Sequence, residues 1–330
     1  MRLKRKIHTG LNWLGNRREA RGGVLLYHRV AEPDLDPFNL CVSPANFERH
    51  LAALAENGRV LSLHEFMEKK NRGQLERGSV SLTFDDGYLD VLTHALPLLE
   101  KYEIPATLFV TTGNLGEAFW WDHLAALVYG SSFLPDTLLL EPTQSSPLLI
   151  GNLSTKGLYD LLYPILRSAS TERRETIFST LSSQLDGADH AQPQRCASAE
   201  ELREAAQHPL LTIGAHTVTH SRLCSLDYRS QVREVSESIE TLSSIIGKRI
   251  DTLSYPFGLE NRDFNGETLA AAREAGVRYG FAADLNAVTH ETDDLVIPRL
   301  WVHNKGENAV KVPLQLWTGT KLASNIGLSS

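Results

Sequence analysis

Short apolar runs alternate with helical patterns along this chain from residue 22 onward. The runs are rich in β-branched and aromatic residues, and they lie at residues 24–27, 80–84, 105–110, 210–213, 250–253, 279–282 and 296–302. The run at residues 105–110 is almost continuously apolar, which is typical of a strand covered on both faces. Strands that alternate with helices form a parallel sheet or barrel with the helices outside. The pattern therefore predicts an α/β fold.

Helices are predicted between these runs from their caps and their apolar spacing. Ser43 and Pro44 open one helix, and Gly58 ends it. The clearest helical pattern begins after Asp227 and ends at Gly247, with its apolar positions in register at Val232, Val235, Ile239, Leu242 and Ile246. Two more helices are expected at residues 91–101 and near 267–275.

The length of 330 residues admits either two domains or one barrel with a large insertion. Residues 113–205 break the alternation, because they are polar, irregular and helix-like. We therefore expect five segments: a basic N-terminal segment at 1–21, the first part of a barrel at 22–112, a helical insertion at 113–205, the second part of the barrel at 206–303 and a C-terminal tail at 304–330.

Charge is distributed unevenly along the chain. The net charge is −7, residues 1–21 carry +6, and the remainder is therefore strongly acidic. Such a body is not built to neutralise nucleic-acid phosphates, so no nucleic-acid partner is expected. The basic segment is either a solvated terminus or a contact for an anionic membrane surface. We find no signal-peptide pattern and no run long enough to span a bilayer, and so expect a cytoplasmic protein, free or resting on the inner face of a membrane.

Unusual polar residues lie at or just beyond the ends of the predicted strands. They are His28, Asp85, Asp86, His216 and His220. In barrels of this kind the chemistry is located at the carboxyl ends of the strands. This shared position is a stronger signal than any single pair of residues.

Each pair taken alone has an ordinary explanation. Asp85 and Asp86 are adjacent carboxylates, which either face solvent in an Asp-Gly turn or need a cation or proton to relieve their repulsion. His216 and His220 are four residues apart, a spacing that lets both imidazoles face one point but also arises by chance among 12 histidines.

Together the pairs supply two imidazole nitrogens and one carboxylate oxygen as ligands for Zn²⁺ or a similar divalent ion. The second carboxylate is then available as a base. A metal that polarises a carbonyl and acidifies water, beside such a base, supports hydrolysis at an acyl carbon.

The motifs Thr83-Phe84-Asp85-Asp86-Gly87, His216-Thr217-Val218-Thr219-His220 and Tyr255-Pro256-Phe257-Gly258 resemble those of the NodB-homology polysaccharide deacetylases, carbohydrate esterase family 4. The resemblance covers residues 22–112 and 206–303. It implies a distorted (β/α) barrel and a metal-dependent hydrolase that removes acetyl groups from a sugar. By this resemblance Asp85 is the general base that activates water on the metal, and Asp86, His216 and His220 are the metal ligands, with Zn²⁺ expected.

The same resemblance assigns substrate contacts and an oxyanion donor. Tyr255, Pro256 and Phe257 match the family's groove motif, and the backbone N–H of Phe257 stabilises the oxyanion. Trp120 and Trp121 are candidate sugar-stacking residues, although a helix that buries its aromatic side chains is the more common arrangement.

Two positions depart from the family pattern. Ser254 occupies the place of an arginine that usually orients the base, and Arg299 is a candidate replacement. The Leu-x-His motif of the general acid is matched by Leu26-Tyr27-His28 at the start of the chain, as in the circularly permuted branch that is similar to poly-N-acetylglucosamine deacetylases. His28 is therefore the candidate acid, with His303 as the alternative.

The expected reaction is removal of N-acetyl groups from a sugar of a polysaccharide, a glycolipid or a lipid-linked glycan precursor. A deformylase or an O-acetyl esterase would use the same site. An inactive sugar-binding barrel is the alternative of another class, which the missing arginine favours and the retained Asp85 disfavours.

Overall fold

The computed structural model describes residues 22–318 except 34–35, 144 and 188–192. Its larger unit holds the described parts of residues 1–32, 39–115 and 199–330, and its smaller unit holds the described parts of residues 33–38 and 116–198. The basic segment at 1–21 and the last part of the expected tail, residues 319–330, lie outside the described residues. Within the described part, no helix is both long and apolar enough to cross a membrane.

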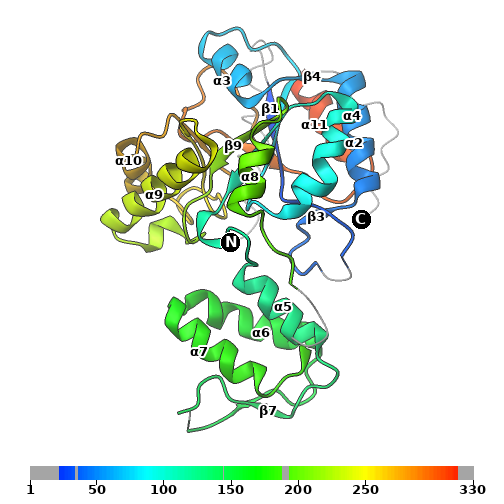
Figure 1. The fold of residues 1–330 in the computed structure, drawn as a ribbon. Coiled ribbons are helices and arrows are strands. Elements are labelled where there is room, and N and C mark those ends of the chain that lie inside the picture. Colours follow the sequence, from blue (N-terminus) through cyan, green and yellow to red (C-terminus); the bar gives the residue numbers. More distant parts are fainter. Residues whose placement is uncertain (1–21, 34–35, 144, 188–192, 319–330) are drawn as a thin grey trace, which may run out of the picture. The chain divides into compact units, whose positions relative to one another are not determined.

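A parallel sheet forms the centre of the larger unit (Figure 1). Its strands pair in the order β11-β10-β9-β6-β5-β1-β12, and β4 pairs with β5. The bounds are β1 Gly23–Tyr27, β4 Arg59–Val60, β5 Ser79–Phe84, β6 Ala106–Val110, β9 Leu211–Ala215, β10 Thr252–Ser254, β11 Tyr279–Phe281 and β12 Arg299–Trp301. A separate two-stranded parallel sheet is formed by β2 Arg29–Val30 and β3 Cys41–Val42.

Backbone hydrogen bonds nearly close the sheet into a barrel. The N–H of Ile297 donates to Gly280 and the N–H of Ala282 donates to Ile297, both at 2.8 Å. Because Ile297 lies just before β12, these bonds connect β11 to the opposite edge of the sheet. Strands β1, β5 and β6 are buried at every position, as expected for a sheet covered on both faces. The predicted (β/α) barrel is confirmed.

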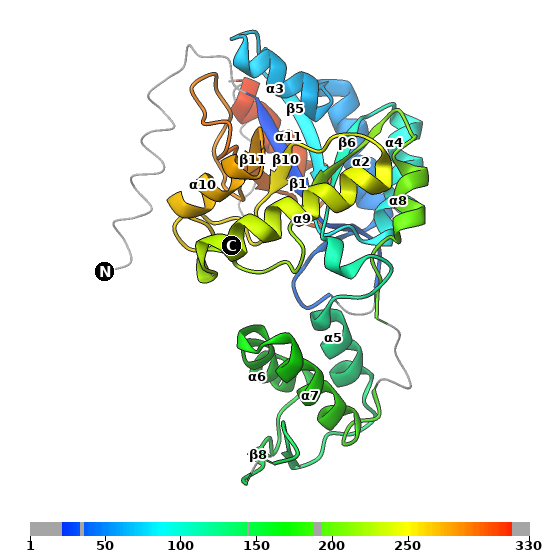
Figure 2. The ribbon, with the colours of Figure 1, turned by 60° about the vertical axis from the view of Figure 1, so that its left-hand side comes forward.

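Helices surround the barrel on its outside (Figure 2). They are α2 Pro44–Asn57, α3 Leu63–Asn71, α4 Leu96–Tyr102, α8 Ala199–Ala205, α9 Tyr228–Ile246, α10 Gly266–Glu274 and α11 Asn308–Thr318, with shorter turns η1 Val91–Ala95, η2 Thr112–Asn114 and η4 Leu223–Ser225. The side chains of Ser43 and Asp227 cap α2 and α9 at their N-termini, and Gly247 ends α9 at φ 69°. These caps are those that the sequence indicates.

The structure corrects two expectations about helices. The segment expected as a C-terminal tail contains α11, which packs on α2 and β1. Its Trp317 occupies the space beside Gly23, where a Cβ atom would lie 2.2 Å from the indole. The predicted helix at 91–101 begins with the π-helical turn η1 and becomes α-helical only at Leu96.

The smaller unit is mainly helical and has its own apolar core. Its elements are α5 Trp120–Gly130, α6 Thr155–Ser168, α7 Thr171–Ser182 and an antiparallel pair, β7 Thr137–Leu138 with β8 Leu148–Leu149. Leucines of all three helices form the core, among them Leu124, Leu162 and Leu181. Residues 33–38 belong to this unit as well, because Phe38 packs on Tyr159 and Tyr163.

Candidate functional site

Polar side chains meet at the carboxyl ends of neighbouring strands in the larger unit. Asp85 and Asp86 follow β5, His216 follows β9, and His28 follows β1. The strands β1, β5, β6 and β9 are parallel and adjacent in this order. Their carboxyl ends therefore lie on one side of the sheet, where barrels of this type place their chemistry.

Asp86, His216 and His220 converge on one point. The Oδ1 atom of Asp86 lies 3.5 Å from Nε2 of His216 and 3.3 Å from Nε2 of His220. The Nδ1 atom of His216 lies 2.8 Å from the carbonyl oxygen of Ser254, so Nδ1 donates and Nε2 is left to act as a ligand. One ligand atom from each of the three residues lies within 4.8 Å of the others. This donor set fits a divalent metal ion.

The Asp86 carboxylate is held in its ionised form. Burial raises the pKa of Asp86, but the imidazoles of His216 and His220 outweigh that effect and hold the pKa well below its ordinary value. A metal ligand must be deprotonated, so this environment suits the role.

Backbone strain is concentrated at this site. Among the described residues, seven that are not glycine have positive φ, and four of these are Asp86, Thr217, His220 and Phe257, at 74°, 65°, 54° and 63°. Each such residue costs about 1–3 kcal/mol and persists only where its surroundings impose it. Strain of this kind is typical of functional sites.

Asp85 lies in a buried network with Arg299 and Ser254. The guanidinium of Arg299 donates from Nη1 to Oδ1 and from Nη2 to Oδ2 of Asp85, both at 2.7 Å. The Ser254 hydroxyl donates to Asp85 at 2.9 Å and accepts from Arg299 Nη2 at 2.7 Å. Two further bonds from Arg299, to Thr83 and to the Ala282 carbonyl, occupy its remaining donors.

This network sets the protonation state of Asp85. Burial raises the pKa of the carboxyl group, but the Arg299 charge, together with His216 and His28, lowers it to below its ordinary value. Asp85 is therefore a carboxylate at neutral pH, as a general base must be.

His28 lies beside Asp85 and Asp86, whereas His303 lies at the surface. The ring of His28 packs on Trp301 with the centroids 5.3 Å apart, and its Nδ1 atom is buried without a hydrogen-bond partner. Burial lowers the pKa of His28 more than Asp86 and Asp85 raise it. His303 is exposed, and the centroid of its ring lies 4.9 Å from that of the Trp301 ring.

The groove motif follows β10 and turns sharply at Phe257. The Phe257 ring meets that of His220 edge-on, with the centroids 4.9 Å apart. Tyr255 is buried instead, because its hydroxyl donates to the Leu295 carbonyl and its ring stacks on Phe264. The motif thus brings Phe257 next to His220, one of the candidate metal ligands, and is anchored through Tyr255.

A sequence model described as polysaccharide deacetylase matches residues 72–280. The chain belongs to the polysaccharide deacetylase family. Among curated proteins, it is 24% identical over 309 residues to the poly-beta-1,6-N-acetyl-D-glucosamine N-deacetylase of Staphylococcus aureus strain NCTC 8325, covering 90% of this chain and 82% of that protein. The protein of the same name from Staphylococcus epidermidis is 25% identical over the same length, covering 90% and 83%.

Solved structures of deacetylases share the fold of this chain. The Streptococcus pyogenes deacetylase PplD in complex with acetate has a TM-score of 0.59 at 18% identity, covering 90% of this chain and 99% of PplD. IcaB from Ammonifex degensii has a TM-score of 0.57 at 19% identity, covering 90% and 97%.

Ser254 makes contacts in the site that the sequence does not predict. It stands where the family pattern has an arginine, and it joins three site residues through its hydroxyl and carbonyl oxygens. Its position at the end of β10 is the only local signal, since the residues it contacts are distant in the sequence.

Trp120 and Trp121 lie in the smaller unit and make the contacts of a packed core. Trp120 stacks on Tyr163 at 5.1 Å and has the guanidinium of Arg174 over its ring at 5.2 Å. Trp121 is buried and stacks on Phe119 at 4.2 Å. These are the contacts of packed aromatic side chains, but Trp120 is only half-buried, so a sugar contact by these rings stays a prediction.

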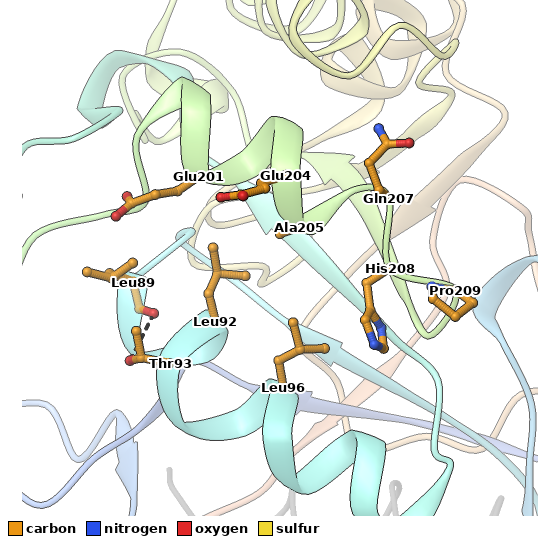
Figure 3. A pocket seen from close by; sticks show the side chains of 10 residues that line it. All are labelled: Leu89, Leu92, Thr93, Leu96, Glu201, Glu204, Ala205, Gln207, His208 and Pro209. Atoms are coloured by element: carbon orange, nitrogen blue, oxygen red, sulfur yellow. Dashed lines mark hydrogen bonds between the residues drawn. The ribbon is translucent and has the colours of Figure 1, made fainter.

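A hollow of about 520 Å³ lies elsewhere on the polysaccharide deacetylase barrel (Figure 3). Leu89, Leu92 and Leu96 line one side of it, and Glu201 and His208 line the other. None of the residues that line it is among the site residues that the sequence predicts.

Proposed function

We propose that this protein is a metal-dependent hydrolase that removes N-acetyl groups from an amino sugar within a glycan. The observation that carries the proposal is the Asp85 carboxyl group, held by two hydrogen bonds from Arg299 next to the converging side chains of Asp86, His216 and His220. Membership in the polysaccharide deacetylase family and the printed names of the relatives support the substrate class.

Asp86, His216 and His220 would hold the metal ion, and two imidazoles with one carboxylate favour Zn²⁺. When bound, the metal supplies a Lewis acid that polarises the acetyl carbonyl and acidifies water. The hydrogen bond from His216 to the Ser254 carbonyl fixes the tautomer in which Nε2 is a ligand.

Asp85 acts as the general base. Its carboxylate accepts the proton of the water that attacks the acetyl carbon, and Arg299 and Ser254 keep both of its oxygens in place. We propose that the backbone N–H of Phe257 stabilises the negative charge that develops on the acetyl oxygen; the contact between the Phe257 and His220 rings supports this role.

The imidazole of His28 acts as the general acid. In its protonated form it gives a proton to the amide nitrogen as the carbon–nitrogen bond breaks, so the products are acetate and a free amine. Burial lowers the pKa of His28, and the carboxylates of Asp86 and Asp85 act against that effect and favour the protonated form. Its contact with Trp301 holds the ring at the end of β1, beside Asp85 and Asp86.

A catalytically inactive sugar-binding barrel would not need this arrangement. Burial of a carboxylate costs free energy, and here three hydrogen bonds are needed to offset that cost. A binding protein has no use for a base beside its metal. The retained Asp85–Arg299 pair therefore favours an enzyme.

The basic segment at 1–21 suggests a second contact for the enzyme. Its net charge of +6 complements an anionic membrane surface or the phosphate of a lipid-linked sugar. We propose that this charge brings the enzyme to such a surface. Binding to vesicles with and without anionic lipid tests this point, and equal binding to both would contradict it.

The activity is tested by acetate release from a β-1,6-linked N-acetylglucosamine oligomer by protein loaded with Zn²⁺. We expect release by the wild type and a rate lower by about 10²–10⁴-fold in Asp85→Asn. N-formyl and O-acetyl sugars are run in parallel, because the same site could accept either. Faster hydrolysis of one of these would change the acyl group assigned, and no hydrolysis of any would refute an enzymatic function.

A further inference from the structure

The loop that joins the two histidines, residues 216–220, has an unusual backbone. Thr217 and His220 both adopt positive φ, at 65° and 54°, although neither is glycine. Bonds within the larger unit hold parts of this loop: the hydroxyl oxygen of Thr217 accepts from the N–H of His220 at 3.2 Å, and the N–H of Gly113 donates to Val218 at 2.8 Å. A strained conformation of this kind needs such restraints.

One carboxylate from α9 restrains the middle of the loop. The Oε2 atom of Glu234 accepts from the N–H of Val218 at 3.0 Å and from the N–H of Thr219 at 2.9 Å. Its Oε1 atom accepts from the Thr219 hydroxyl at 2.7 Å. Bonds to an ionised carboxylate are stronger than neutral ones. Glu234 thus binds both residues that immediately precede His220.

The helix that carries Glu234 is well fixed against the barrel. The same element begins with the side-chain cap of Asp227 and packs on α10, α8 and β9. Its buried positions include Val235, the residue next to Glu234, so the carboxylate extends from a rigid support. Glu237 and Glu240 of the same helix are exposed, whereas Glu234 is half-buried.

We infer that Glu234 is a positioning residue that sets the metal affinity of the site by holding His220 in its binding conformation. The inference rests on the proposed function, because it takes His216 and His220 as metal ligands. Glu234 is not itself among the ligands. Its loss leaves two loop N–H groups and a hydroxyl without their acceptor, and the loop then samples conformations in which His220 Nε2 is displaced from Asp86.

The inference is tested by the affinity of Glu234→Gln for Zn²⁺, measured by competition with a chromophoric chelator. Glutamine keeps the length of the side chain but replaces one acceptor oxygen by an NH₂ group. This donor cannot accept hydrogen bonds from the N–H and O–H groups of the loop. Loss of a residue that orients a ligand typically weakens metal binding by about 10–100-fold, and we expect a rise in Kd of that size. Glu237→Gln, an exposed position on the same helix, is the matched control and should bind as the wild type does.

A spectroscopic measurement separates positioning from general stability. Co²⁺ replaces Zn²⁺, and its visible absorption bands report the ligand geometry. We expect altered bands in Glu234→Gln and unaltered bands in Glu237→Gln. An unchanged Kd and unchanged bands in folded Glu234→Gln would overturn the inference. Failure of the wild type to bind either metal would instead refute the metal site of the proposed function.

Thr219→Val is a second variant in case Glu234→Gln does not fold. It removes the hydroxyl, which lies at an exposed position and bonds Glu234 and the Ser221 hydroxyl, each at 2.7 Å, and it leaves both backbone bonds to Glu234 in place. We expect a several-fold rise in the Kd for Zn²⁺. An affinity equal to that of the wild type would overturn the inference.

Discussion

Replacement of Arg299 by methionine should shift the pH dependence of the enzyme. The side chains of Arg299 and Asp85 are only 1% and 5% exposed, and two bonds of 2.7 Å join them. Removal of one partner from a buried ion pair costs about 3–5 kcal/mol, because the other charge stays buried without compensation. The pKa of Asp85 should therefore rise when the Arg299 charge is removed.

The sign of this effect follows from the protonation state of the base. In the wild type the pKa of Asp85 lies below its ordinary value, because the Arg299 charge and its neighbours outweigh burial. The ion pair therefore stabilises the fold above about pH 4, and this contribution is lost as pH falls through the folded-state pKa. In Arg299→Met only His216 and His28 still oppose the effect of burial on the pKa of Asp85. Asp85 therefore takes up a proton at a higher pH and no longer serves as the base below it.

The assay is kcat/KM for acetate release between pH 4 and 9, together with urea unfolding at several pH values. We expect the acid limb of the profile to move upward in Arg299→Met. The loss of stability should be about 3–5 kcal/mol at high pH and should shrink as pH falls, because a neutral Asp85 needs no partner. Lys70→Met breaks a different ion pair, with Asp294 at 2.6 Å, and should leave the acid limb in place.

An unchanged acid limb in folded Arg299→Met would refute this reasoning, even if the activity fell at every pH. Arg299→Lys provides a second measurement, because it keeps the charge but loses the bidentate geometry. Its acid limb should lie between those of the wild type and Arg299→Met.

Three further predictions concern single residues of the larger unit. His28→Gln should lower kcat for acetate release by about 10²–10⁴-fold with the metal still bound, whereas His303→Gln should stay near the wild type; the reverse result would move the acid role to His303. Ser254→Ala should lower kcat by about tenfold, since it removes a hydroxyl that bonds both the base and its arginine, and an unchanged kcat would show that the arginine suffices. Gly258→Ala should destabilise the protein to urea by more than Gly276→Ala does: both have positive φ, but only at Gly258 would the Cβ atom collide with backbone, at 2.6 Å. Equal losses would mean that the turn relaxes.

The sequence predicted the barrel and most of its helices because their signals are local. Helix α9 carries its Asp227 cap and its Gly247 stop in the local sequence, and the structure has both. Of its predicted apolar positions, Val235, Leu242 and Ile246 are buried, whereas Val232 and Ile239 are only half-buried beside the buried Gln231 and Ser238. Helix α11 was missed although Val310, Leu314 and Trp317 follow a helical spacing, because Pro313 lies inside it. Packing of Trp317 beside Gly23 contributes the stability that the local sequence does not indicate.

The site was predictable where strand ends carry its residues, and not where its contacts are distant. Asp85, Asp86 and His216 follow strands whose ends a parallel sheet must bring together. The bond between Ser254 and Asp85 spans 169 positions, and no spacing rule connects the two. Glu234 is spaced like any solvent-facing acid on an amphipathic helix, and only the path of the loop above it reveals its contacts.

Metal dependence of the reaction tests the central claim most directly. Acetate release is measured while Zn²⁺ is added in steps to metal-free protein. We predict that the rate rises in proportion to the added metal and reaches its plateau at about one equivalent per chain, as one Asp86–His216–His220 site requires. A rate that does not respond to Zn²⁺, or a chain that binds one equivalent and releases no acetate, would contradict the account.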